Sequence, residues 1–224
     1  MDREELLRRY AAGERDFTGV NLKGVDPIDI DLARICLRGA TFYQVNLTNV
    51  YLGGANLCGA DFGEVTFNEV NFADAWMSGM SMGDVNLRKV NFTKAELCGA
   101  YLDGVIIEDV VFDEALMLGI RFLQCTVRIS SFIASNLRGC DIDGVQFFDV
   151  DFSDAFLKGF RMFETSIVNT NLSRACLKGG DGEWTDYLQR VTDGKLKSPI
   201  LNNIIFNETI MPDGSTFTGR TLRV

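Results

Sequence analysis

The sequence predicts an all-β solenoid, a rod of about eight stacked four-sided coils with short capping helices. Three observations predict this fold. A large apolar residue recurs every five positions from Phe17 to Leu177, with Pro27 as the one departure. A second series of smaller residues lies two positions before these centres, and a glycine returns every 20 residues. Neither an α-helix nor a β-strand produces a period of five, so the repeat itself defines the fold.

The smaller series shows how many units of five make one coil. Val45 and Val50 are followed by Ala55 and Ala60, and the order of two valines and two alanines starts again at Val65. The pattern therefore repeats every 20 residues, which gives a coil with four sides. Residues 20 apart should stack in neighbouring layers about 4.8 Å apart. This predicts a ladder of large side chains inside one side of the rod: Leu52, Phe72, Phe92, Phe112, Phe132 and Phe152.

Glycines mark one corner of each coil. They are Gly19, Gly39, Gly59, Gly79, Gly99, Gly119, Gly139, Gly159 and Gly179. Because glycine adopts positive φ without a steric penalty, we expect this corner to turn through a left-handed backbone conformation.

The five-residue unit, as in "ANLCG" (55–59) and "VNFTK" (90–94), resembles the repeat of the pentapeptide repeat proteins. The resemblance implies a right-handed quadrilateral β-helix in which the centre and the residue two before it point inward, while the other three positions face solvent. Two flanking motifs, "LLRRYAAGERDF" and "TIMPDG", are similar to those of cyanobacterial members of the family.

The two ends of the repeat divide the chain into expected segments. Asp2 and Glu5 form a helix-start signal, Leu6, Leu7 and Tyr10 form an apolar stripe, and a helix over residues 2–12 follows. We assign residues 1–15 to an N-terminal capping helix and residues 16–180 to the solenoid. The spacing of apolar residues in 181–194 predicts a short amphipathic helix within an insertion at 181–200. The period of five resumes one residue out of phase, at Leu201, Phe206 and Met211, so 201–224 is expected to be a final partial coil with a tail.

Composition limits the functions that the chain could serve. The net charge of −9 argues against nucleic-acid binding, which depends on neutralising phosphates. The chain has no histidine, no apolar segment long enough to span a membrane and no export signal, so we expect a cytoplasmic protein. The six cysteines should be reduced, with Cys125 and Cys140 in small inward positions.

The sequence contains no arrangement of residues typical of an enzyme. There is no Cys/His cluster for a metal and no glycine-rich phosphate loop. The many carboxylates are interpreted as solvated positions of the repeat. We therefore expect no catalytic residue, no cofactor, no metal and no small-molecule substrate.

Outward positions should be polar, yet one region places large apolar residues there. These candidate protein-contact residues are Ile106, Val111, Leu116, Leu118, Leu123, Ile129, Ile133, Phe148, Phe156 and Phe163. They predict a contact with an unidentified protein or a homodimer. The alternative is that the C-terminal segment covers them, or that a bulge in the coil turns them inward.

Two functions remain open. The first is a non-enzymatic interaction or scaffold module, a rigid rod that presents a surface to a protein. The alternative comes from the resemblance, because some members of the family mimic DNA and bind type II topoisomerases such as gyrase. Charge argues against it here: acids and bases alternate by layer, as at Glu69, Lys89 and Asp109. A duplex carries about one negative charge per 1.7 Å.

Overall fold

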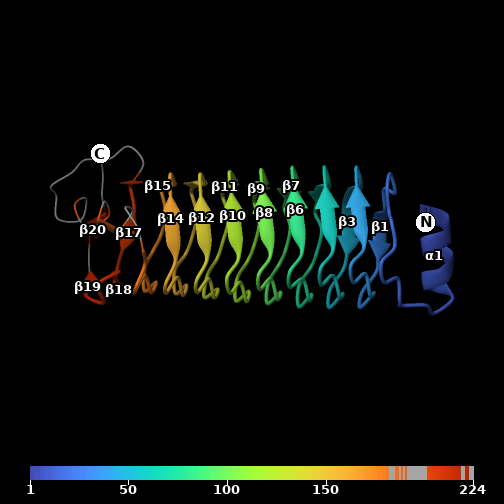
Figure 1. Ribbon diagram of the computed structural model, residues 1–224, viewed down its shortest axis with the longest axis horizontal. Helices are drawn as coiled ribbons and strands as arrows, with labels where there is room; N and C mark the ends of the chain where they lie inside the picture. The colour runs from blue at the N-terminus through green and yellow to red at the C-terminus, as the bar shows by residue number, and fades with distance from the viewer. Residues whose placement is uncertain (182–184, 187, 189, 191–200, 218–219, 222–224) are drawn as a thin grey trace.

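The computed structural model describes residues 1–181, 185–186, 188, 190, 201–217 and 220–221. It shows a parallel β-solenoid, which confirms the predicted all-β solenoid. The coils stack along the long axis of a rod, and helix α1 (Arg3–Ala11) lies at the N-terminal end (Figure 1).

Two parallel sheets form two of the four sides. The first sheet, in spatial order, contains β1 (Ile28–Asp31), β3 (Asn46–Tyr51), β5 (Thr66–Asn68), β7 (Asn86–Arg88), β9 (Ile106–Glu108), β11 (Thr126–Arg128), β13 (Gln146–Phe148), β15 (Ser166–Val168) and β16 (Leu201–Asn202). The second contains β2 (Thr41–Tyr43), β4 (Asp61–Gly63), β6 (Ser81–Gly83), β8 (Tyr101–Asp103), β10 (Arg121–Leu123), β12 (Asp141–Asp143) and β14 (Arg161–Phe163). Near the C-terminus two short antiparallel pairs follow, β17 (Ile205–Phe206) with β20 (Arg220–Thr221) and β18 (Thr209–Ile210) with β19 (Thr216–Phe217).

The other two sides are held by single β-bridges. On one of them Asn71 pairs with Asn91, and because its inward centres include the phenylalanine ladder we call it the phenylalanine side. On the other Trp76 pairs with Glu96, and because it ends at the glycine corner we call it the glycine side. In both sheets and bridges the partner lies 20 residues away, as the repeat predicts.

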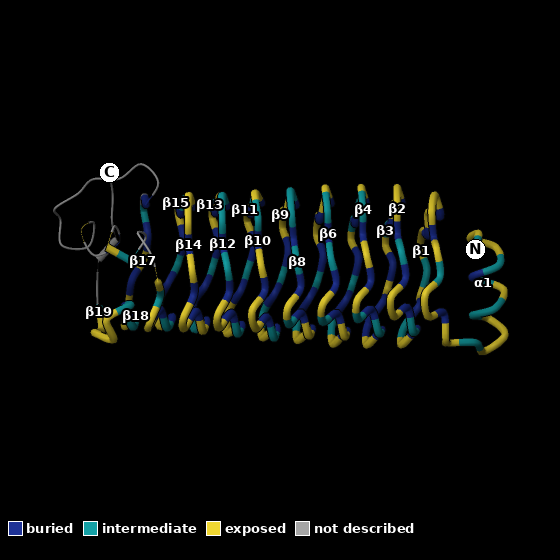
Figure 2. The backbone as a smooth tube through the Cα atoms, in the orientation of Figure 1, coloured by how far each residue is buried: buried dark blue, intermediate teal, exposed yellow. Residues whose placement is uncertain are grey.

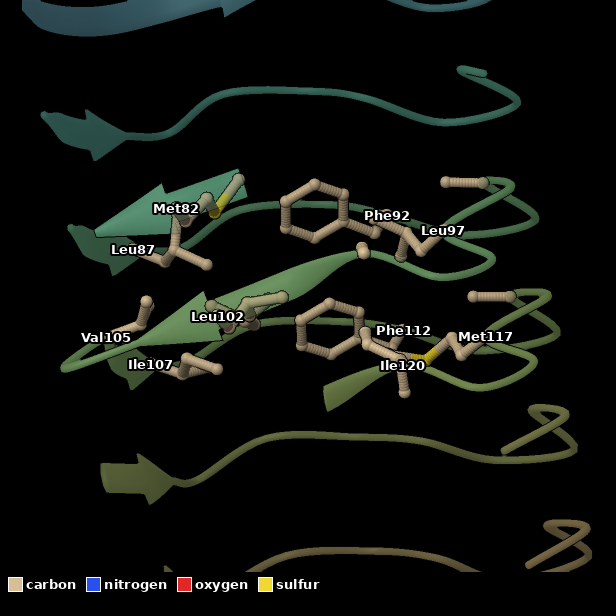
Figure 3. Packing of buried hydrophobic residues seen from close by; sticks show 14 of the residues in the cluster. Met82, Leu87, Phe92, Leu97, Leu102, Val105, Ile107, Phe112, Met117 and Ile120 are labelled. Carbon is tan, nitrogen blue, oxygen red and sulfur yellow. The ribbon is translucent and has the colours of Figure 1, made fainter. Parts of the chain in front are cut away.

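The interior consists of the two inward series. Large centres and small residues two places before them are buried along the rod, while the positions between them are exposed or half-buried (Figure 2). The ring of Phe112 lies parallel to the rings of Phe92 and Phe132, with centroids 4.9 and 4.7 Å away. Figure 3 shows Phe92 and Phe112 one above the other, in the offset arrangement that aromatic rings favour. The phenylalanine ladder is therefore confirmed.

Helix α1 covers the open N-terminal coil. Asp2 is its N-cap, since its carboxylate accepts a hydrogen bond of 2.8 Å from the backbone N–H of Glu5. Leu6 is buried against the first coils, and the Tyr10 hydroxyl donates to the carbonyl oxygen of Ala33 at 3.0 Å. The helix predicted over residues 2–12 is thus present with bounds one residue shorter at each end.

The C-terminal end shows why the period shifts. Leu201 pairs with Ile167, and Ile205 bridges to Asn171, so the last coil continues the stack at an offset of 34 residues instead of 20. The predicted helical insertion at 181–200 lies mostly outside the described residues. The described ones within it, at 185–186, 188 and 190, are helical.

Candidate functional site

The outward positions of this rod form straight columns, because each residue lies directly over the one 20 places earlier. All ten candidate contact residues occupy such columns, and none of them is buried. Six are exposed: Ile106, Leu118, Ile129, Ile133, Phe156 and Phe163. The other four, Val111, Leu116, Leu123 and Phe148, are half-buried. The interpretation that a bulge turns them into the core is therefore wrong.

The ten residues do not form one patch. Ile106 and Phe148 lie on the first sheet, Leu123 and Phe163 on the second, and Val111 and Ile133 on the phenylalanine side. Ile129 lies at a corner, and Leu116, Leu118 and Phe156 lie together on the glycine side.

The glycine side carries two parallel columns with distinct chemistry. The apolar column contains Trp76, Leu116 and Phe156, with a polar residue in each intervening layer, because Glu96 bridges Trp76 to Leu116 and Asn136 bridges Leu116 to Phe156. Trp76 is 54% exposed and Phe156 is 51% exposed. The cationic column runs beside it and contains Arg138, Lys158 and Lys178, all exposed.

The position of the apolar column favours a polar residue on backbone grounds. Asn56 in this column accepts a hydrogen bond from the backbone N–H of Cys58 at 3.1 Å, and Asn71 on the phenylalanine side accepts from Ala73 at 2.8 Å. Such bonds stabilise the turn that follows. Trp76, Leu116 and Phe156 cannot make them. These residues therefore lose a local hydrogen bond and also expose apolar surface.

A shallow depression lies beside the cationic column. Its volume is about 520 Å³, and it is lined by Leu118, Arg138, Gly139, Lys158 and Gly159. A Cβ atom added at either glycine would meet no atom within 4 Å, so the backbone here is open to a ligand. The depression is bordered by an apolar side chain and two cations.

A second groove follows the corner between the first sheet and the phenylalanine side. Its volume is about 480 Å³, and its lining includes Val111, Ile129 and Ile205 together with Asp109 and Asp149. Asp149 already accepts a hydrogen bond from Asn169 at 3.0 Å. The groove thus brings two of the candidate residues together, but its carboxylates partly bond to their own column.

Elsewhere the candidate residues are more isolated. The guanidinium of Arg128 lies 5.3 Å from the centroid of the Phe148 ring, which covers part of that side chain. Phe163 borders a smaller depression with Arg161 and Asp141, which form an ion pair at 2.8 Å.

Charges on most columns pair within the molecule. Lys89 pairs with Glu69 at 2.9 Å, and Lys94 pairs with Glu114 at 3.6 Å. The guanidinium of Arg174 donates to Asp154 and lowers the pKa of that carboxyl below its usual value. The alternation of acid and base predicted for these corners is therefore present as ion pairs.

The chemistry of the cysteines is that of buried or isolated thiols. Burial raises the pKa of Cys125 to about 11 and that of Cys140 to about 12, so both remain protonated thiols at neutral pH. All six cysteines are free, and the described residues contain no group of three or more possible metal ligands. No helix in the described part of the chain is long and apolar enough to cross a membrane.

Sequence reasoning missed several exposed apolar residues. Trp76, Tyr51, Ile28 and Ile205 are each more than 40% exposed, as the values of 54, 44, 47 and 44% show. The signal for Trp76 was available, since it directly precedes the centre Met77 and shares a column with Leu116. The search for apolar residues had concentrated on the coils after residue 105.

The model of the pentapeptide repeats family matches the chain in eight copies, which include residues 28–63, 46–83, 66–104 and 81–119. No curated protein matches the chain. Among solved structures, the chain is similar to HetL, a pentapeptide repeat protein involved in heterocyst differentiation regulation from the cyanobacterium Nostoc sp. strain PCC 7120. The identity is 23% over 97% of this chain and 100% of HetL, with a TM-score of 0.35.

Two further solved structures show lower identity. Full-length QnrB1, a plasmid-mediated fluoroquinolone resistance protein, is 12% identical over 84% of this chain and 93% of its own, with a TM-score of 0.38. Rfr23, a pentapeptide repeat protein from the cyanobacterium Cyanothece 51142, is 17% identical over 73% of this chain and 98% of its own, with a TM-score of 0.28.

Proposed function

Because the chain belongs to the pentapeptide repeat family, we propose that it is a non-enzymatic protein-binding module that presents the glycine side of its rod to a partner protein. The observation that carries the proposal is the apolar column. Trp76 and Phe156 are more than half exposed, at 54 and 51%, in a position where asparagine would stabilise the turn. Large apolar groups gathered on a surface mark interaction sites.

The solenoid suits this role because its columns are fixed by backbone pairing. Every layer of the glycine side is bridged to the next, from Asp16 and Cys36 to Cys176 and Ile210. Side chains on it are therefore held at intervals of about 4.8 Å without a cost in backbone ordering on binding. A preorganised surface of this kind favours binding to a partner with a matching spacing.

The experiment replaces Phe156 with asparagine, both alone and together with Trp76→Asn. Asparagine at these positions can accept the turn hydrogen bond, as Asn56 does, so the variants should fold at least as stably as the wild type. We expect a protein captured from an extract of the source cells by the wild-type chain to be lost from the double variant. Mass spectrometry of the bound fractions measures the loss.

The matched control is Phe163→Asn, which removes an equally exposed phenylalanine, also at 51%, from the second sheet. Captured proteins should be unchanged by this control. Equal capture by wild type and the double variant, with both folded by circular dichroism, would contradict the assignment of the glycine side.

A second copy of the chain is one partner that this surface would admit. Sedimentation velocity of the wild type and of Phe156→Asn separates this case from binding of another protein. A wild-type dimer that becomes a monomer in the variant identifies a homodimer. A monomer in both samples places the partner elsewhere.

The second candidate function is a DNA-mimicking binder of type II topoisomerase. The ion pairs Lys89–Glu69 and Lys94–Glu114 interrupt the negative charge along two corners, so we expect no competition with DNA. A supercoiling assay with purified gyrase tests this expectation. Inhibition at a stoichiometric amount of the chain would favour the topoisomerase function over ours.

A further inference from the structure

The cationic column breaks the charge pattern of the rod. In other columns opposite charges follow one another, as in Arg121, Asp141 and Arg161 on the second sheet. Among the described residues, Arg138, Lys158 and Lys178 form the only run of three like charges in successive layers. No described carboxylate lies within ion-pair distance of their charged nitrogens. This run is the more unusual because the whole chain carries a net charge of −9.

Stacking like charges costs free energy. Residues in neighbouring layers are about 4.8 Å apart, a distance at which side chains of the same sign repel each other. Anions placed over the column would remove this repulsion and gain favourable interactions with all three cations. The column is thus complementary to a ligand with several negative charges in a row.

The apolar column limits what kind of anion fits. Lys158 follows Phe156 by two residues in the same layer, and Leu118 stands in the cationic column one layer before Arg138. A ligand that covers the cations therefore also contacts Phe156 and Leu118. It must carry carboxylates along one edge and apolar groups along the other.

The spacing within the apolar column matches a helix. Trp76, Leu116 and Phe156 are separated by even numbers of layers, so the shortest interval, from Leu116 to Phe156, is about 9.6 Å at two layers of about 4.8 Å. Residues seven apart on an α-helix are about 10.5 Å apart along its axis. Acidic residues three or four apart on the flank are about 5–6 Å apart, close to the spacing of the cations.

We propose that the glycine side binds an acidic amphipathic helix of a partner protein, which lies along the rod. Its apolar residues cover Leu116, Leu118 and Phe156, and its carboxylates pair with Arg138, Lys158 and Lys178. The inference rests on the proposed function, since it names the chemistry of the partner at that same surface. A nucleic acid is disfavoured because the net charge of −9 opposes the approach of a polyanion without apolar groups.

The test selects helical peptides of 21 residues from a phage-displayed library on the full wild-type chain. The variant Arg138→Gln, Lys158→Gln, Lys178→Gln serves as the second target, and Arg88→Gln, Arg121→Gln, Arg128→Gln serves as the matched control on the two sheets. We expect the selected peptides to be rich in Asp and Glu, with an apolar residue every seven positions. Their affinity should fall at least about tenfold on the first variant, weaken with added salt, and persist on the control.

Selection of neutral or basic peptides, or equal binding to both triple variants, would overturn the inference. A 20-base-pair DNA duplex is measured in parallel, and tighter binding of the duplex than of the peptides would also overturn it. The proposed function fails separately. If Trp76→Asn with Phe156→Asn abolishes capture of the cellular partner but the first triple variant does not, the protein-binding role stands and the acidic helix does not.

Discussion

At the scale of single residues, Ile129 combines two unfavourable features. Its φ is +49°, in the left-handed region that β-branched residues resist, and its side chain is 60% exposed. The residues stacked on either side of it, Asp109 and Asp149, adopt similar φ angles of +56° and +55°. The corner therefore imposes this backbone on whichever residue stands there, and isoleucine is strained by it.

Replacing Ile129 with asparagine should stabilise the protein by about 1 kcal/mol, because asparagine tolerates the left-handed region and isoleucine does not. Asn169 occupies the same column at φ +52°, so the substitution uses a residue that this corner already accepts. The midpoint of urea denaturation measures the gain.

The matched control is Ile133→Asn. Ile133 is also exposed, at 36%, but it has no positive φ, so no backbone strain is relieved and stability should change by less than about 0.5 kcal/mol. An equal shift in both variants would attribute the effect to surface polarity instead of strain.

At the scale of elements, the sequence predicted what the repeat determines. The two inward series, the phenylalanine ladder, the glycine corner and the N-terminal helix all follow from spacing, and each is present. The corners that lack glycine were harder to predict. Charged residues such as Glu69 and Lys89 adopt positive φ there, which their side chains do not signal.

Polar residues in the inward series show a second limit of sequence reasoning. Ser135 stands where the repeat places alanine or valine, yet it is fully buried. Its hydroxyl donates to the carbonyl oxygen of Phe132 at 2.7 Å, which satisfies the buried polar group. The candidate site had a related limit, because the sequence placed each apolar residue on a side but did not show that Trp76 joins Leu116 and Phe156 beside three cations.

The phenylalanine stack behaves as one element, and Phe112 stands at its middle. Its ring is fully buried between two parallel neighbours at 4.9 and 4.7 Å. Phe112→Ala should lower the free energy of unfolding by about 3–5 kcal/mol, because it leaves a cavity and interrupts the stack. Urea denaturation followed by circular dichroism measures the loss.

Phe112→Leu is the control for this prediction. Leucine occupies the same inward column at Leu52 and Leu172, so it fits the coil and should cost about 1 kcal/mol. A denaturation midpoint of Phe112→Ala equal to that of the wild type would contradict the packing of the stack.

At the scale of the whole molecule, a stack of coils presents unpaired backbone wherever it is left open. At the N-terminal end this edge is covered by α1, through buried Leu6, the hydrogen bond from Tyr10 to Ala33 and the guanidinium of Arg9, which lies 5.1 Å from the centroid of the Phe17 ring. The helix thus closes the first coil against addition of another strand.

Deletion of residues 1–12 should therefore make the rod self-associate through its exposed first coil, since an open parallel edge and the uncovered Phe17 can pair with a second molecule. Sedimentation velocity over a range of concentrations measures the increase over the full chain. Leu6→Asp should produce a weaker increase, because it loosens the helix without removing it. Glu4→Ala changes an exposed position of the same helix and should leave the association state unaltered. If the deleted chain sediments as the full chain does at every concentration, the helix does not serve as a barrier to stacking.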